Sequence, residues 1–406
     1  MKTLLSILAF ISVSNFTIAQ NAYIPNFLSN TVSVINLATN TVTHTIPVGI
    51  GPQGVTVSND GRTVYITNSN GNTVSEINTA TNRVTATIPV GLYPVGICLS
   101  PDDSILYVVN NNFNSGNTVS VISTLTNTLM STITVGTGAL GIATSPDGKT
   151  IYVTNYADPS DTVSLIDAST NTVSNTITVG ALPDGIAISP DGNKGYVTNA
   201  SSNTVSVINT TNNSVTATIP VGNFPYGISI SPNGEKVYVS NSISDTVSVI
   251  NTNDNSIYST IDVGSGPRGV SISPDGSKAY IVNGGDDTVS VIDTALNNVT
   301  NIIPVGNFPV AFGKFISSES NLGNEEINSI ELMHFPNPTT GLINIVLEET
   351  KSIINLRLTN VIGQTILTDN YKSTNRISLD LNVSSGTYFL QLEIDGQLIT
   401  KKILKK

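Results

Sequence analysis

The 406-residue sequence has no tryptophan, one cysteine, two histidines and only 11% charged residues. A single cysteine excludes an intramolecular disulfide. The scarcity of Lys and Glu, which Ser, Thr and Asn replace, argues against long helices, a coiled coil or a disordered acidic chain. The formal net charge is −11, which disfavours nucleic acid and anionic membranes as partners because neither offers a counter-charge.

Long apolar runs are also missing, apart from one near the start of the chain. Lys2 precedes the apolar run 4–13, and small residues follow before Gln20. This run is too short to span a bilayer, and the pattern predicts a secretory signal peptide over residues 1–19. We therefore expect an exported protein without a transmembrane segment, secreted or at the cell surface.

What the chain does contain is a repeat, seen clearly in residues 185–222. Four short runs rich in Val, Ile, Thr and Tyr are separated by turn residues, which predicts a four-stranded meander that is too small to be stable alone. Its third run begins with a Thr-Val-Ser element that recurs every 42 to 45 residues, at Thr31, Thr73, Thr118, Thr162, Thr204, Thr246 and Thr288. A period near 40 residues with four strands per unit predicts the blades of a β-propeller.

The second run of each repeat begins with tyrosine and ends with asparagine, as in Tyr196-Val197-Thr198-Asn199. The tyrosines are Tyr23, Tyr65, Tyr107, Tyr152, Tyr196, Tyr238 and Tyr280. These strings resemble the YVTN family of β-propeller repeats over residues 21–316. The resemblance implies an extracellular or surface-layer-like protein, but a fold alone does not define a ligand.

The phase of the repeat indicates how the propeller closes. We name the four strands of a repeat A to D in chain order. The chain enters on a B strand at Tyr23 and leaves on an A-like strand at 309–315, so these two segments are expected to share one blade. Such a seam leaves no long unpaired edge. The fold class is therefore all-β, a seven-bladed propeller over 21–316 followed by a small C-terminal β-sandwich.

The last part of the chain differs from the repeats. Residues 317–331 form an acidic linker, and residues 332–406 show short apolar runs divided by glycines, which predicts the sandwich. This tail resembles a type A sorting domain of the type IX secretion system, which implies the type IX machinery as a partner; an ordinary accessory sandwich is the alternative. The residues that carry the resemblance are Pro336, Asn337, Pro338, Gly341, Gly386, Tyr388, Lys401 and Lys402.

Motifs for catalysis or cofactors are weak. Three G-x-G-x-x-G strings, at 49–54, 136–141 and 264–269, lead into strands and not into helices, so they do not predict a dinucleotide site. A calcium-like spacing at 251–262 lacks the required glycine. Cys98 replaces small residues of sister A strands, and His44 is the only histidine of the propeller. We therefore expect no cofactor, no metal and no catalytic residues.

Positions that differ between the repeats are free to form a site. They lie in the turns from D to A strands and in the loops from B to C strands, and are Gln53, Tyr93, Phe113, Tyr156, Asp184, Phe224, Tyr226, Arg268 and Phe308. Aromatic and charged side chains on loops over a rigid ring suit the recognition of a protein or a glycan by a monomer. Two alternatives remain open. The aromatics pack the loops only, or the protein is a propeller hydrolase of lactonase type.

Overall fold

The computed structural model describes residues 20–157, 161–317, 332–335, 339–360, 364–394 and 397–406. The predicted signal peptide, most of the predicted linker, and Pro336, Asn337 and Pro338 of the sorting motif lie outside these residues. The chain divides into two compact units, Met1–Asn321 and Leu322–Lys406. Each is considered by itself.

The first unit contains six four-stranded antiparallel sheets and one three-stranded sheet, with each strand paired to its neighbour in the chain. The three-stranded sheet is β1 (Asn21–Asn26), β2 (Thr31–Asn36) and β3 (Thr41–Pro47). The next three sheets are β4 (Pro52–Val57), β5 (Thr63–Asn68), β6 (Thr73–Asn78) and β7 (Arg83–Pro89); β8 (Pro94–Leu99), β9 (Ile105–Asn110), β10 (Thr118–Ser123) and β11 (Thr128–Thr134); and β12 (Ala139–Thr144), β13 (Thr150–Asn155), β14 (Thr162–Asp167) and β15 (Thr172–Thr178).

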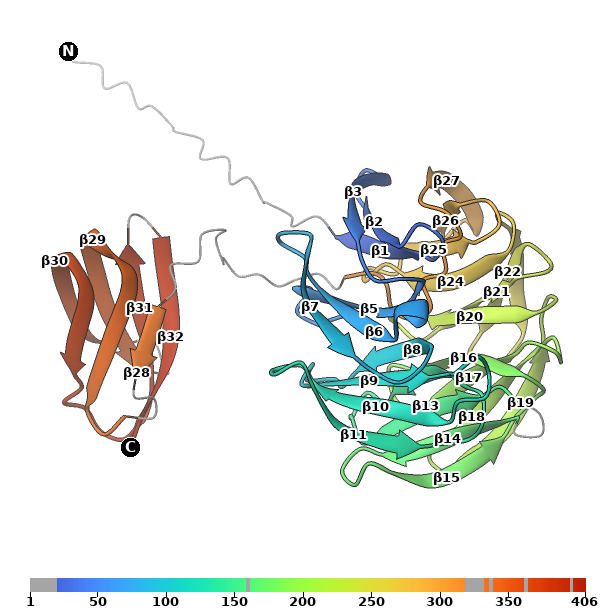
Figure 1. The fold of residues 1–406 in the computed structure, drawn as a ribbon, viewed down its shortest axis with the longest axis horizontal. Coiled ribbons are helices and arrows are strands. Elements are labelled where there is room, and N and C mark those ends of the chain that lie inside the picture. Colours follow the sequence, from blue (N-terminus) through green and yellow to red (C-terminus); the bar gives the residue numbers. More distant parts are fainter. Residues whose placement is uncertain (1–19, 158–160, 318–331, 336–338, 361–363, 395–396) are drawn as a thin grey trace, which may run out of the picture. The chain divides into compact units, whose positions relative to one another are not determined.

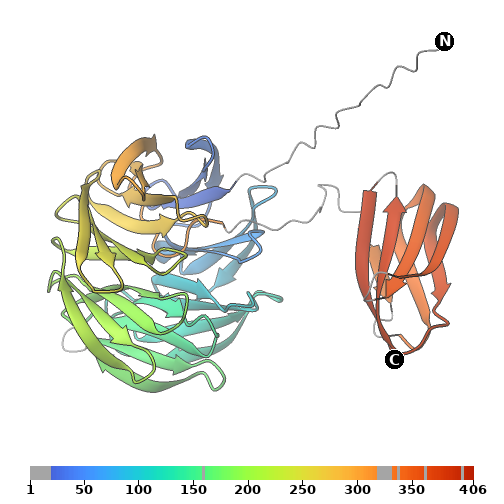
Figure 2. The same ribbon diagram turned by 180° about the vertical axis from the view of Figure 1, so that it is seen from behind.

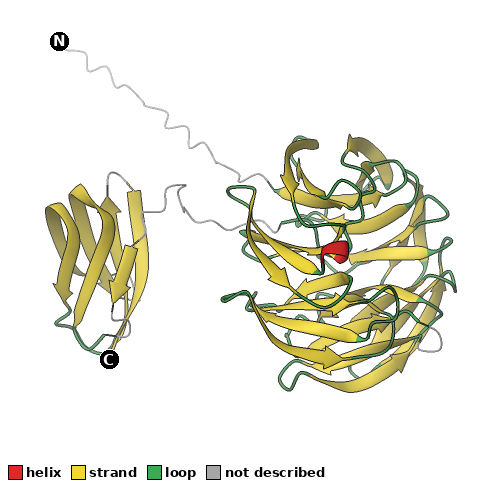
Figure 3. Ribbon diagram, viewed as in Figure 1, coloured by secondary structure: helices red, strands yellow, loops and turns green. Residues whose placement is uncertain are grey.

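The remaining three sheets repeat the pattern. They are β16 (Pro183–Ile188), β17 (Lys194–Asn199), β18 (Thr204–Asn209) and β19 (Ser214–Pro220); β20 (Pro225–Ile230), β21 (Lys236–Asn241), β22 (Thr246–Asn251) and β23 (Ile257–Asp262); and β24 (Pro267–Ile272), β25 (Lys278–Asn283), β26 (Thr288–Asp293) and β27 (Asn298–Pro304). The helix η1 (Ser69–Gly71) is a single short turn (Figure 3). The unit is a β-propeller.

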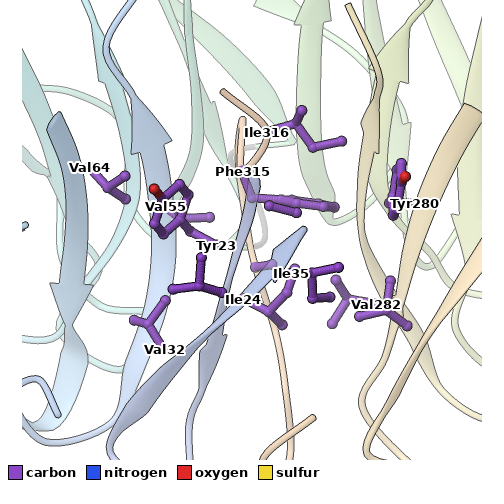
Figure 4. Packing of buried hydrophobic residues seen from close by; sticks show 14 of the residues in the cluster. Tyr23, Ile24, Val32, Ile35, Val55, Val64, Tyr280, Val282, Phe315 and Ile316 are labelled. Atoms are coloured by element: carbon purple, nitrogen blue, oxygen red, sulfur yellow. The ribbon is translucent and has the colours of Figure 1, made fainter. Parts of the chain in front are cut away.

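The two ends of the propeller meet in one sheet, as the phase of the repeat predicts. The sheet β1–β3 lies beside the sheet β24–β27 in both views (Figures 1 and 2). Tyr23 N–H donates to the Phe315 carbonyl at 2.8 Å, and Val310 N–H donates to the Pro25 carbonyl at 3.0 Å. Phe315 is fully buried and packs with Tyr23 and Ile24 (Figure 4). The segment 309–316 therefore completes the sheet that β1 begins.

The asparagine of the Tyr-Val-Thr-Asn strand ties the B strand to the C strand. Asn199 is buried, and its Nδ2 donates to Thr204 Oγ1 and Ser206 Oγ at 3.0 Å each. The same pair of bonds recurs in every repeat, from Asn26, Asn68, Asn110, Asn155, Asn241 and Asn283. Buried polar groups require hydrogen-bond partners. The two motifs that recur in every repeat, Y-V-T-N and T-V-S, therefore supply the donor and the acceptors of one hydrogen-bond network.

The A strands, which are the inner strands around the axis, approach one another so closely that glycine is required. In six repeats the third residue of the A strand is glycine, and a Cβ there would lie 2.5 Å or less from a backbone carbonyl oxygen of the next inner strand. The seventh repeat has Ala311, where the backbone leaves β geometry at a φ of 51°. At Gly185, whose N–H donates to Thr198 Oγ1, the same threonine donates to the Tyr226 carbonyl of the next sheet. Threonine and glycine thus join neighbouring sheets around the axis.

The second unit is one five-stranded antiparallel sheet around its own apolar core. Its strands are β28 (Leu332–Phe335), β29 (Leu342–Asn360), β30 (Thr365–Asp380), β31 (Gly386–Ile394) and β32 (Gln397–Lys405). The sequence predicts more and shorter strands, but the runs at 343–347 and 353–358 are joined in β29 because neither glycine nor proline lies between them. Gly386 begins β31, Lys401 and Lys402 lie on β32, and Tyr388 is buried with its hydroxyl donating to the Ser384 carbonyl at 2.9 Å.

Candidate functional site

A ring of side chains surrounds one mouth of the propeller axis. Each comes from the second residue of an inner strand, directly before the position that packs against the next strand. The ring residues are Gln53, Val95, Leu140, Asp184, Tyr226, Arg268 and Val310. Hydroxyl groups of the preceding sheet donate to the backbone carbonyls of four of them. The donors are Thr67 for Val95, Thr154 for Asp184, Thr198 for Tyr226 and Ser240 for Arg268. Asp184, Tyr226 and Arg268 follow one another around the ring, and Gln53 lies between the apolar Val310 and Val95.

Above this ring lies a cavity with a volume of about 270 Å³. Seven of the nine residues predicted from the sequence line it, namely Gln53, Tyr93, Phe113, Tyr156, Asp184, Phe224 and Tyr226. The two others lie beside it, because the Arg268 guanidinium carbon is 5.3 Å from the Tyr226 ring centre and 4.7 Å from the Phe308 ring centre. The structure therefore brings all nine predicted residues to one place.

The aromatic side chains on the turns are held in an unfavourable backbone conformation. Tyr93, Phe224 and Phe308 have φ values of 49°, 54° and 51°, at the turn position where three sister turns have Gly51, Gly138 and Gly266. A left-handed conformation costs a bulky residue on the order of 1–2 kcal/mol, so strain of this kind points to a functional constraint.

Hydrogen bonds from the turn N–H groups to side chains of the preceding sheet fix these strained turns. The Phe224 N–H donates to Asn203 Oδ1 at 2.9 Å, and the Tyr93 N–H donates to Asn72 Oδ1 at 2.8 Å. Asp287 Oδ1 accepts the equivalent bond from the Phe308 N–H at 2.7 Å. The B–C loops thus hold the aromatic rings rigidly at the mouth of the cavity.

Two walls of the cavity are built from ring contacts. The Tyr93 and Phe113 ring centres are 4.3 Å apart, although Phe113 itself is 70% exposed. On the other side, Tyr226 packs edge-on against Phe312, with ring centres 5.3 Å apart. Phe312 comes from the closing segment of the chain and fills the centre of the ring with Val310.

Asp184 is the acidic residue of the cavity lining. Its side chain is 1% exposed, and its Oδ1 has no hydrogen-bond partner in the part of the chain that the structure describes. Burial raises the pKa of this carboxyl well above its usual range, and the charge of Arg268 opposes the rise only in part. No ion pair within 4.0 Å joins Asp184 to Arg268 among the described residues. Burial also raises the pKa of Tyr156, and the negative charge of Asp184 adds to that shift.

Because Asp184 is buried without a hydrogen-bond partner for its Oδ1 among the described residues, we expect its carboxyl to lower the stability of the fold at neutral pH. Folding raises the pKa of Asp184 above the unfolded value of about 3.9, so stability falls as pH rises through that value toward the folded pKa. Asp184→Asn is expected to stabilise the protein at neutral pH by about 1–2 kcal/mol and to have little effect below about pH 4. Thermal unfolding of both proteins at the two pH values measures this difference.

Asp191 in the next turn of the same sheet is the matched control. Hydrogen bonds from Ser189 and from the Asn193 backbone lower its pKa, so Asp191→Asn removes stabilisation that is present above the unfolded pKa. The two variants are thus expected to shift stability in opposite directions at neutral pH. A loss of stability in Asp184→Asn at neutral pH would show that this carboxyl serves the fold.

Four residues of the cavity lining are not among the nine predicted from the sequence, namely Val95, Asn111, Asn114 and Leu140. Val95 occupies the same place before the inner glycine as Gln53 and Asp184, so a strict superposition of the turns would have found it. Asn111 belongs to the longer B–C loop that contains Phe113; its Nδ2 donates to the Ala139 carbonyl at 2.8 Å.

The other motifs noted in the sequence lie in turns and strands of the propeller. The three G-x-G-x-x-G strings lead into β4, β12 and β24, and the calcium-like spacing spans the turn between β22 and β23. Cys98 is half-buried against an apolar cluster, and burial raises the pKa of its thiol. Among the described residues no group of three or more His, Cys, Asp or Glu side chains is placed to hold a metal ion. In the same residues we find no helix that is both long and apolar enough to cross a membrane.

Comparison with solved structures shows the fold of the propeller. A hydrazine synthase of Kuenenia stuttgartiensis has a TM-score of 0.62 and 22% identity, covering 71% of this chain and 99% of that one. A functionally unknown protein of Desulfotomaculum acetoxidans DSM 771 has a TM-score of 0.64 and 20% identity, covering 73% and 100%. A protein of Bacteroides uniformis ATCC 8492 described as a candidate 6-phosphogluconolactonase has a TM-score of 0.61 and 19% identity, covering 72% and 98%.

Comparison with protein families is more specific, although no curated protein matches the sequence. A YNCE-like β-propeller model matches residues 4–120, and a choice-of-anchor I domain model matches residues 99–312, which is more than half of the chain. A secretion system C-terminal sorting domain model matches residues 333–406, as the tail motifs predict. This sorting domain, read by type IX secretion, implies a secreted or cell-surface protein. The chain therefore belongs to the choice-of-anchor I domain family and carries a type IX sorting domain that follows its β-propeller in the sequence.

Proposed function

We propose that this protein is an exported binding module whose seven sheets are the blades of a closed propeller and whose loop face recognises a protein or a glycan. The observation that carries the proposal is the aromatic cavity over the axis, in which Tyr93 and Phe224 occupy strained positions that three sister turns fill with glycine. Leu182 takes the same conformation in a fourth turn, with a φ of 53°, but it does not line the cavity, whereas the rings of Tyr93 and Phe224 do. Rigid aromatic rings offer large contact areas with little loss of conformational entropy on binding.

A propeller hydrolase of lactonase type is the second candidate, supported by the buried Asp184 and by the fold of the Bacteroides uniformis protein. Against it, acid–base hydrolysis needs groups that take up and release protons in turn. Asp184 is the only carboxyl side chain among the described residues that line the cavity, and no histidine lies there. We therefore propose that the protein binds its ligand without transforming it.

The test is binding to isolated outer-surface proteins and glycans with variants of the aromatic turns. Tyr93→Gly and Phe224→Gly each introduce the residue that three sister turns have, so the backbone is expected to keep its shape. Each should lower affinity at least ten-fold, whereas Met130→Ala, an exposed change on the outer strand β11, should leave it unchanged. Binding that survives both glycine variants would contradict the proposal. Turnover of a lactone that Asp184→Asn abolishes would favour the hydrolase.

A further inference from the structure

We propose that the cavity receives an alkylammonium group, either the side-chain ammonium of a protein lysine or that of a free organic amine. The group would lie between the aromatic rings and the carboxyl of Asp184. This inference rests on the proposed binding function and names the chemical group that the site recognises.

The aromatic walls support a cation. Five aromatic rings line the cavity, from Tyr93, Phe113, Tyr156, Phe224 and Tyr226, and no Lys or Arg does so among the described residues. The faces of aromatic rings attract cations, and sites for methylated ammonium groups use several rings together. The net charge of −11 adds a long-range attraction for a positive ligand.

The hydrogen bonds within the cavity argue against a sugar in the same place. A sugar ring needs several free donors and acceptors for its hydroxyl groups. Here Gln53 Nε2 already donates to the Tyr93 hydroxyl at 3.0 Å. Both ends of the Asn111 amide are engaged, by the Ala139 carbonyl and by the Asn114 N–H at 2.7 Å. The amides of Gln53 and Asn111 therefore stabilise the loops, which reduces the hydrogen-bonding capacity that the lining offers to a polyol.

Asp184 is the polar group of the lining that a cation requires. Asp184 Oδ1 is buried without a partner, and an unpaired buried carboxyl is unfavourable until a donor or a positive charge reaches it. Arg268 does not fill this role, because Tyr226 and Phe308 hold its guanidinium between their rings. Any ligand ammonium supplies the charge, and a primary ammonium also supplies N–H donors, whose charge-assisted bonds are among the stronger ones.

The test compares ligands of equal shape and different charge by calorimetry on the whole protein. Choline is expected to bind at least ten-fold more tightly than its neutral isostere 3,3-dimethylbutan-1-ol, and n-butylammonium more tightly than n-butanol. Asp184→Asn should remove the preference, whereas Asp262→Asn, an exposed acid at the end of β23, should retain it. A lysine-containing peptide and its acetyl-lysine form then distinguish a protein lysine from a free amine as the source.

Equal binding of the charged and neutral ligands would overturn the inference, and so would failure of both cations to bind. Binding of N-acetylglucosamine in their place, lost in Phe224→Gly, would also overturn it while leaving the loop face as a binding site. The proposed function itself fails if surface ligands bind the protein regardless of the aromatic variants, or if the protein turns over a lactone and Asp184→Asn abolishes this activity. The two failures are therefore distinguishable.

Discussion

Gly185→Ala is expected to destabilise the propeller by about 3 kcal/mol, whereas Gly195→Ala in the adjacent strand of the same sheet is expected to stabilise it by about 0.5–1 kcal/mol. A Cβ on Gly185 would lie 2.5 Å from the Tyr226 carbonyl oxygen of the next sheet. That oxygen belongs to the backbone and also accepts the Thr198 hydroxyl bond, so it cannot move without separating the two sheets. The change therefore acts on the contact that joins neighbouring sheets.

Gly195 is the matched control because it lacks any such contact. A Cβ there would meet only side-chain atoms, the nearest being Ile188 Cδ1 at 3.2 Å. Sister strands carry a larger apolar residue at this place, such as Val64 or Val237. Denaturant unfolding of the two variants measures the difference. Equal effects of the two alanines would show that the contact between inner strands is not what requires glycine.

The fold could be predicted from the sequence because the residue pattern of each repeat indicates where its turns and strands lie. The alternation of Val, Ile and Thr, the turn residues and the phase of the first and last strands were sufficient for the propeller and for its closing segment. The extent of the strands in the C-terminal unit was not predictable in the same way, because β29 and β30 have no second copy with which to compare them.

The position of the candidate site followed from variation between the repeats, but its physical character did not. Nothing in the sequence shows that Asp184 is buried without a hydrogen-bond partner, because that depends on side chains from several sheets that meet at the axis. The place of Phe312 at the centre of the ring depends in turn on the path of the closing segment. The strained turns are easier to infer from the sequence, since Phe224 lies at a position where three sister turns have glycine.

Asn199→Leu is expected to destabilise the propeller by about 3–4 kcal/mol, the second large effect. Leucine has nearly the shape of asparagine, so the change removes hydrogen bonds with little change in packing. Asn199 Nδ2 donates to Thr204 and Ser206, and its Oδ1 accepts the Gly180 N–H at 3.1 Å. Without these bonds the buried Ser206 hydroxyl and the Gly180 N–H lose their partner, and each unsatisfied buried group costs about 1–3 kcal/mol.

Asn193→Leu, in the turn before the same strand, is the control for this prediction. Asn193 is exposed, and the sister turns have Arg62, Lys149 or Glu235 there, so a change below about 0.5 kcal/mol is expected. Urea unfolding of both variants, with hydrogen exchange of the Gly180 amide, measures the two effects. If Asn199→Leu were as stable as the parent protein, the repeated Tyr-Val-Thr-Asn asparagine would have to be explained by something other than this network. In that case the strict recurrence of Thr and Ser in the facing strand would lose its physical reason as well, because their hydroxyls are the acceptors of the same bonds.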